Sequence, residues 1–192
     1  MLKKRIAIFA SGTGSNAINL IHYFKNSESI EVGFVLSNNS EAPIVASSEA
    51  LGVPVKCFTN TEVSNGDFLT QTCKVENIDW IILAGYLRLI PSVFIEQYNN
   101  RIINLHPSLL PKYGGKGMFG SNVHKAVLEN KENETGITVH FVNQEFDKGA
   151  VIAQFHCAIN ANDSLESVQK KIQFLEHNYL PVVVKNTINY NS

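Results

Sequence analysis

The strongest constraint on the fold is an alternation, repeated through residues 1–100, between short β-branched runs and longer amphipathic segments. The runs at 5–10, 31–36, 53–58 and 79–84 are expected strands, and the segments 16–25, 42–51 and 67–77 between them have helical spacing. The strand runs are almost continuously apolar, as strands covered by helices on both faces require. This alternation predicts βαβ units around a parallel sheet.

The second half of the chain predicts a different arrangement. Further strands are expected at 102–105, 137–142 and 151–159, and a turn at residues 147–149 indicates that the last two form an antiparallel pair. A helix is expected over 163–180, with Asp163 and Glu166 as a capping box. The predicted fold class is therefore a three-layer α/β fold: an open, mostly parallel sheet with helices on both faces, a Rossmann-like N-terminal half and an antiparallel pair near the C-terminus.

Length and composition indicate one domain over residues 1–192 that binds small molecules. The chain has 192 residues, 44% of them hydrophobic and 17% charged, with a net charge of −1. This balance argues against disorder, membrane spans and attraction to nucleic acid. Cys57, Cys73 and Cys157 lack metal or redox spacing and are expected to be reduced core thiols in a cytoplasmic protein.

A glycine-rich turn at residues 11–17 directly follows the first expected strand and opens a helix. Backbone N–H groups and the positive end of the helix dipole at such a turn suit a phosphate. Gly12, Gly14 and Ala17 match a dinucleotide pattern, but residues 36–39 lack the acidic residue that would bind a ribose. The turn therefore favours a phosphate monoester over NAD, and a turn without any ligand stays an alternative.

Asn104 and His106 are the next candidates, at the end of the strand expected over 102–105. Positions 104 and 106 point to one face of a strand, so the amide and the imidazole would project together. Both groups can donate hydrogen bonds to an oxyanion that develops on a carbonyl under attack. A purely structural histidine is the alternative, although Pro107 and Pro111 would hold the following loop rigid, as a catalytic site needs.

Asp147 lies in the turn between the last two strands. Aspartate is common in turns for structural reasons alone, so a structural role is the alternative. Beside His106, its charge would favour the imidazolium form and raise the histidine pKa. Asn104, His106 and Asp147 together would suit direct acyl transfer, since no partnered Ser or Cys nucleophile is evident. His22, His140 and His156 have no metal-site spacing, so no metal and no further histidine role are expected.

Four segments in register resemble the phosphoribosylglycinamide formyltransferase family of folate-dependent enzymes. The segments are 11–16, 83–90, 104–111 and 136–142 with Asp147, and the resemblance spans residues 5–180. It implies the formyltransferase fold, with a phosphate-binding half at about 1–100 and a catalytic and folate-binding half at about 101–192. It also implies formyl transfer from 10-formyltetrahydrofolate to the amine of glycinamide ribonucleotide, in the cytoplasm, by a monomer or homodimer.

The resemblance also implies residue roles. Ribonucleotide contacts would come from Gly14, Ser15, Asn16, Gln173 and Glu176, while Asn104 and His106 would stabilise the tetrahedral oxyanion and Asp147 would keep His106 protonated. The folate pocket would include Asn104 and be lined by Leu87, Arg88, Leu89, Ile90, Asn143, Gln144, Glu145, Phe146 and Asp147. Two features depart from the family: residues 59–67 contain no basic residue for a folate glutamate tail, and the loop 114–120 has no histidine, although Lys116 could close over an anion.

Other readings of the same motifs stay open. Methionyl-tRNA formyltransferase and formyltetrahydrofolate hydrolase also have an Asn-His-Asp site. The first is expected to be longer and more basic than this sequence, and the second usually has an added N-terminal domain, whereas the first strand is expected here at about Arg5, so length disfavours both. A sugar-nucleotide formyltransferase is weaker, because its nucleotide-binding elements are not evident. A non-catalytic folate or nucleotide-binding module would be expected to lose one of the three site residues.

Overall fold

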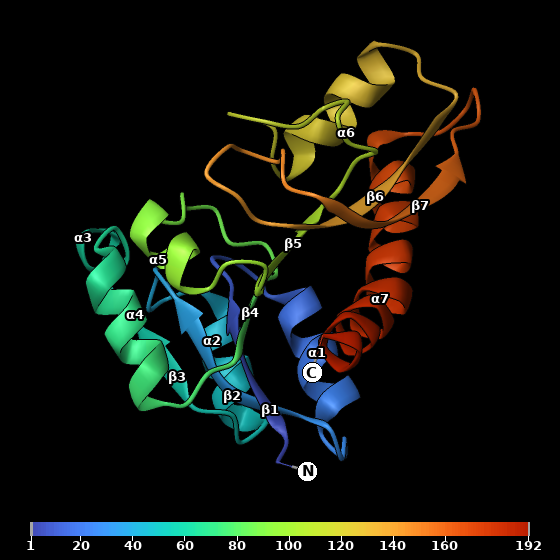
Figure 1. Ribbon diagram of the computed structural model, residues 1–192. Coiled ribbons are helices and arrows are strands. Elements are labelled where there is room, and N and C mark those ends of the chain that lie inside the picture. Colours follow the sequence, from blue (N-terminus) through green and yellow to red (C-terminus); the bar gives the residue numbers. More distant parts are fainter. Residues whose placement is uncertain (1, 192) are drawn as a thin grey trace.

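The computed structural model describes residues 2–191, so Met1 and Ser192 of the expected domain lie outside the described residues. One seven-stranded sheet crosses the described part of the chain in the order β3-β2-β1-β4-β5-β6-β7 (Figure 1). The strands are β1 (Lys4–Phe9), β2 (Ile30–Ser37), β3 (Val55–Cys57), β4 (Trp80–Leu83), β5 (Ile102–His106), β6 (Glu134–Phe141) and β7 (Val151–Ala158). Strands β1 to β5 pair in parallel, whereas β6 is antiparallel to both β5 and β7. The predicted fold class is confirmed.

Seven helices surround the sheet in the described residues. They are α1 (Ser15–Phe24), α2 (Pro43–Ala50), α3 (Asn60–Val63), α4 (Gly66–Val75), α5 (Ser92–Gln97), α6 (Ser121–Glu129) and α7 (Leu165–Tyr190). Helices α3, α5 and α6 are absent from the sequence prediction. The first two are only four and six residues long, too short for a clear periodic signal.

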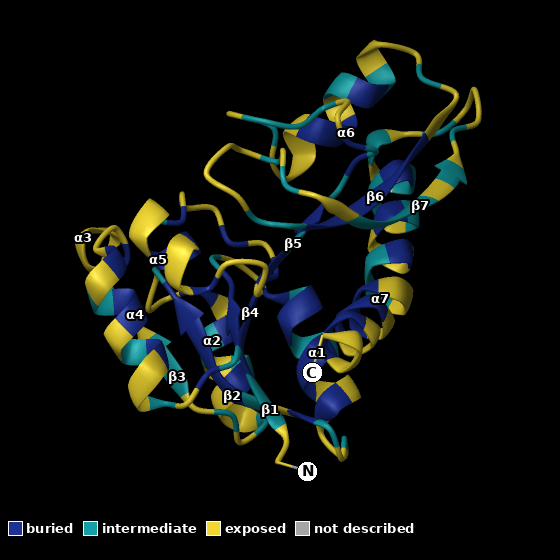
Figure 2. Ribbon diagram, viewed as in Figure 1, coloured by how far each residue is buried: buried dark blue, intermediate teal, exposed yellow. Residues whose placement is uncertain are grey.

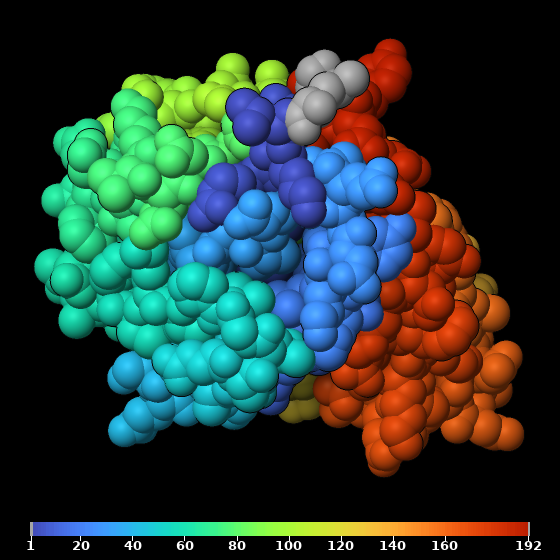
Figure 3. Space-filling view, turned by 90° about the horizontal axis from the view of Figure 1, so that it is seen from below, coloured from blue at the N-terminus to red at the C-terminus, as the bar shows by residue number. Residues whose placement is uncertain are grey.

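Residues of β1 alternate between two hydrophobic cores. Ile6 and Ile8 pack in the core that α1 and α7 cover, while Ala7 and Phe9 pack in the core under α4 and α5. Figure 2 shows the central strands buried, with exposed residues mainly on the outer sides of the helices. The view from below in Figure 3 shows the orange and red residues of the C-terminal part beside the blue residues near the N-terminus. Both faces of the sheet are therefore covered, as the apolar strand runs predict.

Helix α7 differs from its prediction at both ends. Its N-cap is Ser164, whose Oγ accepts a hydrogen bond from the Ser167 N–H at 3.2 Å. The predicted capping box of Asp163 and Glu166 is wrong, because Asp163 instead accepts from the Asn160 N–H at 2.7 Å and pairs with Lys171. At the other end, the helix continues through Pro181 to Tyr190, since the residues that follow the proline bury further apolar side chains against the sheet.

The cysteines lie in three different environments. Cys73 is buried in α4 and Cys157 is half-buried in β7, whereas Cys57 is exposed. The prediction of three core thiols is therefore wrong for Cys57. It ends β3, a three-residue strand at the edge of the sheet, where only one neighbouring strand flanks it.

The strand order also decides where loops meet. Because β1 and β4 are neighbours, the turn that follows β1 lies beside the segment that follows β4. This is the switch point of an open α/β sheet, at which ligands commonly bind. No helix within residues 2–191 is long and apolar enough to cross a membrane.

Candidate active site

The turn after β1 is built around Gly14, which caps α1 with a φ of 71°. A Cβ atom at this position would lie 2.3 Å from Cδ1 of Ile44, so only glycine fits. The turn delivers Ser15 and Asn16 to the first turn of a ten-residue helix. The N–H groups of such a turn have no partner within the helix and can bind an anion.

Ser11 ties this turn to its neighbours. Its Oγ donates to Oδ1 of Asn38 at 2.6 Å and accepts from the Leu87 N–H at 3.0 Å. Asn38 also donates to Oδ1 of Asn60 at 3.0 Å. The position at which a dinucleotide site would need an acidic residue is thus occupied by an amide that braces the turn.

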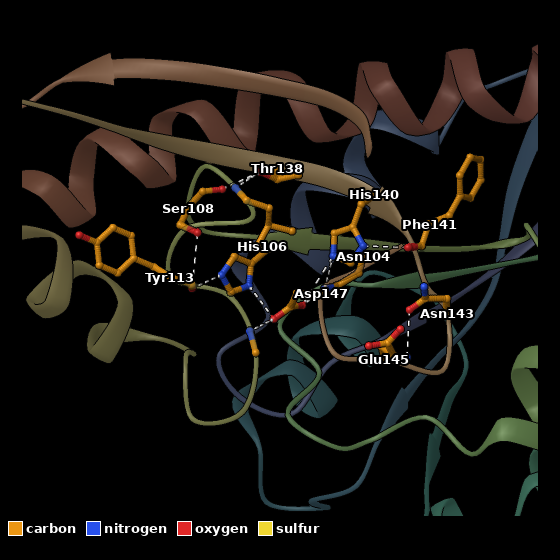
Figure 4. A network of polar contacts seen from close by, with 12 residues as sticks. Asn104, His106, Ser108, Tyr113, Thr138, His140, Phe141, Asn143, Glu145 and Asp147 are labelled. Carbon is orange, nitrogen blue, oxygen red and sulfur yellow. Dashed lines mark hydrogen bonds and ion pairs between the residues drawn. The ribbon is translucent and has the colours of Figure 1, made fainter. Parts of the chain in front are cut away.

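Asn104, His106 and Asp147 lie together, as Figure 4 shows. Strand β5 provides Asn104 and His106, while the β6–β7 connection provides Asp147 in a left-handed conformation with a φ of 55°. Oδ2 of Asp147 is 3.6 Å from Nδ1 of His106, and Oδ1 is 3.5 Å from Nδ2 of Asn104. Figure 4 shows both strand residues pointing toward the aspartate, so the three predicted residues share one site.

His140 completes this cluster, although the sequence prediction gives it no role. It lies opposite Asn104 in the antiparallel register of β5 and β6. Nε2 of His140 is 3.1 Å from Nδ2 of Asn104 and 3.7 Å from Oδ1 of Asp147. Only the strand pairing, which no local pattern specifies, would have indicated this contact.

Burial governs the protonation of His106. It lowers the pKa of His106 below the ordinary value, more than the Asp147 charge and the hydrogen bond to the Tyr113 carbonyl raise it. The charge of Asp147 therefore acts in the predicted direction, but burial outweighs it, since only 4% of the residue is exposed.

Asp147 is held ionised. Burial alone would raise its pKa, but the contact with His140, the hydrogen bond from the Gly115 N–H and the charges of both histidines lower it overall. The Gly115 N–H donates to Oδ2 at 2.9 Å. The site thus combines a carboxylate with a buried imidazole.

One cavity of about 790 Å³ joins this cluster to the turn after β1. Among the predicted residues, those that line it are Ser15, Asn16, Leu87, Arg88, Leu89, Ile90, Asn104, His106, Asn143, Glu145, Phe146, Asp147, Gln173 and Glu176. Gly14 and Gln144 do not line it: Gly14 packs on Ile44, and Gln144 donates to Oε1 of Glu96 at 3.2 Å. The volume lies in the upper part of the range for small-molecule sites.

Helix α7 closes the end of the cavity near the glycine-rich turn. Nδ2 of Asn16 donates to Oε2 of Glu176 at 2.8 Å, while Oδ1 of Asn16 is buried without a partner. Burial raises the pKa of Glu176, and the hydrogen bond from Asn16 partly opposes this shift. This end of the cavity therefore offers polar groups for a ligand.

The loop 114–120 and α6 form another wall, with Lys116 and the buried His124 among the lining residues. Nδ1 of His124 has no hydrogen-bond partner. The prediction singles out Lys116 but not His124, because α6 was not expected. Across residues 2–191, no group of three or more His, Cys, Asp or Glu side chains is arranged to hold a metal ion.

The cavity lies at the switch point of an open α/β sheet and is lined by a glycine-rich turn of the phosphate-binding type and by the Asn-His-Asp cluster. This combination defines a protein that transfers groups between small molecules. The family model described as formyl transferase matches residues 4–184, and the chain belongs to this family. Members of the family depend on folate.

The most similar relatives include phosphoribosylglycinamide formyltransferases. The chain is 31% identical to that of Bacillus subtilis, covering 98% of this chain and 97% of the relative. The chloroplastic proteins of Arabidopsis thaliana and Vigna unguiculata are 37% and 36% identical, and the chain spans only 64% and 60% of their lengths. A crystal structure of the Bacillus halodurans phosphoribosylglycinamide formyltransferase superposes with a TM-score of 0.88 at 31% identity, covering 98% of this chain and 97% of that one.

Proposed function

We propose that this protein transfers the formyl group of 10-formyltetrahydrofolate to the amine of glycinamide ribonucleotide, a step of purine biosynthesis. The observation that carries the proposal is the single cavity that connects an anion-binding helix start with the Asn104, His106 and Asp147 cluster. A transferase that joins a phosphorylated amine to an acyl donor needs both elements within reach of each other. The similarity to proteins named for this activity supports the same reaction.

The ribonucleotide is assigned to the α1 end of the cavity. The N–H groups that follow Gly14, together with Ser15 and Asn16, would bind the 5′-phosphate. Gln173 and Glu176 lie three residues apart on α7 and line the same end, so they would contact the ribose hydroxyls and the glycinamide. The phosphate would thus anchor the substrate while its amine extends toward His106.

In the proposed reaction, the substrate amine attacks the formyl carbon and the bond from that carbon to the folate nitrogen then breaks. Asn104 Nδ2 has two N–H groups, and one donates to His140. The other makes only the long 3.5 Å contact to Asp147, so we assign it to the oxyanion. His106 would accept the proton that the amine loses and pass it to the departing folate nitrogen, with Asp147 stabilising the imidazolium.

The folate is assigned to the opposite end of the cavity. Leu87, Arg88, Leu89 and Ile90 form one wall, and Asn143, Glu145 and Phe146 form the other. Leu87, Leu89 and Phe146 are exposed apolar side chains, which suits contact with an aromatic ring system. We further propose that residues 1–192 act as one domain, with about 1–100 holding the phosphate and about 101–192 supplying catalysis and most of the folate contacts.

A spectrophotometric assay tests the proposal. The purified protein is incubated with 10-formyltetrahydrofolate or its dideaza analogue, with and without glycinamide ribonucleotide. Turnover only in the presence of the ribonucleotide is the expected result. Turnover without it would instead identify a hydrolase, and no turnover under either condition would favour a non-catalytic binding module.

A further inference from the structure

His106 makes its shortest polar contact with the backbone rather than with Asp147. Its Nε2 is 2.8 Å from the carbonyl oxygen of Tyr113, a contact that Figure 4 draws as a dashed line. A carbonyl can only accept a hydrogen bond, so Nε2 carries a hydrogen in every protonation state compatible with this contact. The proton that His106 gains and loses is consequently on Nδ1, the nitrogen that faces Asp147 at 3.6 Å.

The Tyr113 carbonyl reaches this position because the residue adopts an unusual backbone conformation. Tyr113 has a φ of 56°, which tyrosine rarely adopts. Its hydroxyl donates to Oε1 of Glu132 at 3.0 Å, and Lys112 Nζ lies 2.9 Å from the same oxygen. Ser108 Oγ donates to the neighbouring Lys112 carbonyl at 2.7 Å. The tether to Glu132 thus offsets the cost of the left-handed conformation.

We propose that Tyr113 is a positioning residue for His106. The contact of its hydroxyl with Glu132 holds its own carbonyl against Nε2 of His106. This contact makes Nδ1 the nitrogen that transfers the proton. This role for Tyr113 extends the proposed function. Its effect on proton transfer rests on that function. Tyr113 itself contacts no reacting atom in this scheme. Its effect reaches the reaction only through the orientation and tautomer of His106.

The other polar side chains around His106 do not hold its Nε2. Asp147 lies on the Nδ1 side, His140 from β6 acts on His106 through its charge, and the charge of His106 acts on His124 from α6. None of these three side chains donates to or accepts from Nε2, which is paired with the Tyr113 carbonyl. His140 has the reverse arrangement, since its Nδ1 is 2.8 Å from the Phe141 carbonyl and its Nε2 faces Asp147. The two histidines are therefore expected to be opposite neutral tautomers.

Nuclear magnetic resonance of the unmodified, ¹⁵N-histidine-labelled protein tests the tautomers without any activity measurement. At about pH 8, above the ordinary histidine pKa of about 6.5, the nitrogen shifts should report Nε2–H for His106 and Nδ1–H for His140. The signals are assigned with His106→Gln and His140→Gln. A His106 signal of the Nδ1–H tautomer would overturn the proposal even if formyl transfer is observed.

The variant Tyr113→Phe removes the tether and keeps the ring. We expect kcat to fall about 3- to 10-fold, the range that one hydrogen bond accounts for, with KM for the ribonucleotide unchanged. A detectable share of His106 should change tautomer, and the acid limb of the kcat/KM profile should move to lower pH, because the Tyr113 contact raises the pKa of His106.

Tyr98→Phe is the matched control. The Tyr98 hydroxyl is also a donor to an oxygen, that of the Ile78 carbonyl at 3.2 Å, but it lies in the core under α4 and α5. This control should lose stability and leave the His106 tautomer and the pH profile unchanged. If Tyr113→Phe behaves like Tyr98→Phe, its role is merely structural and the proposal fails. If the unmodified protein shows the expected tautomers but transfers no formyl group, the proposed function fails instead.

Discussion

Asn16 in the first turn of α1 donates a hydrogen bond to Glu176 in α7 at 2.8 Å, across 160 positions of sequence. The contact joins the glycine-rich turn to the last helix and closes the cavity at the end assigned to the ribonucleotide. Glu176 is largely buried and Oδ1 of Asn16 has no hydrogen-bond partner, so this end of the cavity has polar groups that suit a polar ligand. The site proposed for the ribonucleotide is therefore built from segments near both ends of the chain.

Replacing Glu176 should weaken ribonucleotide binding more than it slows the chemical step. For Glu176→Ala we expect KM for the ribonucleotide to rise about 10- to 100-fold, the range for hydrogen bonds to a charged group, with kcat changed far less. Steady-state kinetics at saturating folate measure both constants. Lys185→Ala, an exposed change on the same helix, is the control. An unchanged KM in Glu176→Ala would remove Glu176 from the site.

Gly14 should be irreplaceable for two separate reasons. Gly14→Ala adds a Cβ that would meet Ile44 at 2.3 Å and must adopt a φ of 71°, so both strain and overpacking apply. Gly52→Ala has a similar φ of 76° but open space around the new atom. Urea unfolding should show a loss of about 1–2 kcal/mol for Gly52→Ala from the left-handed backbone, and about 1–3 kcal/mol more for Gly14→Ala from overpacking. Equal losses would show that Ile44 moves aside.

His106→Ala should separate binding from chemistry. We expect kcat to fall by about 10²- to 10⁴-fold, the range for removal of a general acid–base group. Ribonucleotide affinity, measured by titration calorimetry, should stay the same, because the phosphate is proposed to bind at Ser15 and Asn16, which are separate residues of the cavity lining. His22→Ala, an exposed histidine on α1, should leave both quantities unchanged. Full activity in His106→Ala would refute the assigned proton transfer.

Asp147→Asn should change the pH dependence as well as the rate. The negative charge of Asp147 raises the pKa of His106, so its removal lowers that pKa further. If neutral His106 accepts the amine proton, the acid limb of kcat/KM then moves to lower pH while the rate falls, since the imidazolium loses its counter-charge. A limb that moves to higher pH would contradict this order of proton transfer.

Acid should destabilise the protein through its buried histidines. Burial lowers the pKa of His106, His124 and His177 in the folded state. Their contribution to stability is fully present above the unfolded pKa of about 6.5 and is lost as the pH falls from there through the folded values. Urea midpoints should therefore be lower at acidic than at neutral pH. His124→Leu should reduce this difference, because its unpartnered Nδ1 lies buried; an unchanged difference would exclude His124 as a contributor.

Much of the architecture follows from local patterns. Apolar runs predict every strand of the sheet in the described residues, and Gly14 marks the turn because glycine adopts a left-handed backbone more easily than other residues. The period of a strand also predicts that Asn104 and His106 share one face. These features need only short stretches of chain, since each arises from the conformational preferences of a few consecutive residues.

Other features needed the assembled sheet. The register of β5 and β6 sets His140 opposite Asn104, and the β6–β7 connection brings Asp147 to both. Burial of His106 reverses the pKa shift that its carboxylate neighbour alone would cause, and an edge position leaves Cys57 exposed. Helix α7 continues past Pro181 because its later residues pack on the sheet.

The sequence by itself therefore determined the strands, the phosphate-type turn and the residue types available for acyl transfer. Tertiary structure alone decided which of those residues meet, which nitrogen of His106 is engaged by the Tyr113 carbonyl and which charges are favoured. The physical reason is range: backbone preferences and side-chain periodicity act within a few residues, whereas strand register, desolvation and the contact of Asn16 with Glu176 depend on segments far apart in the chain.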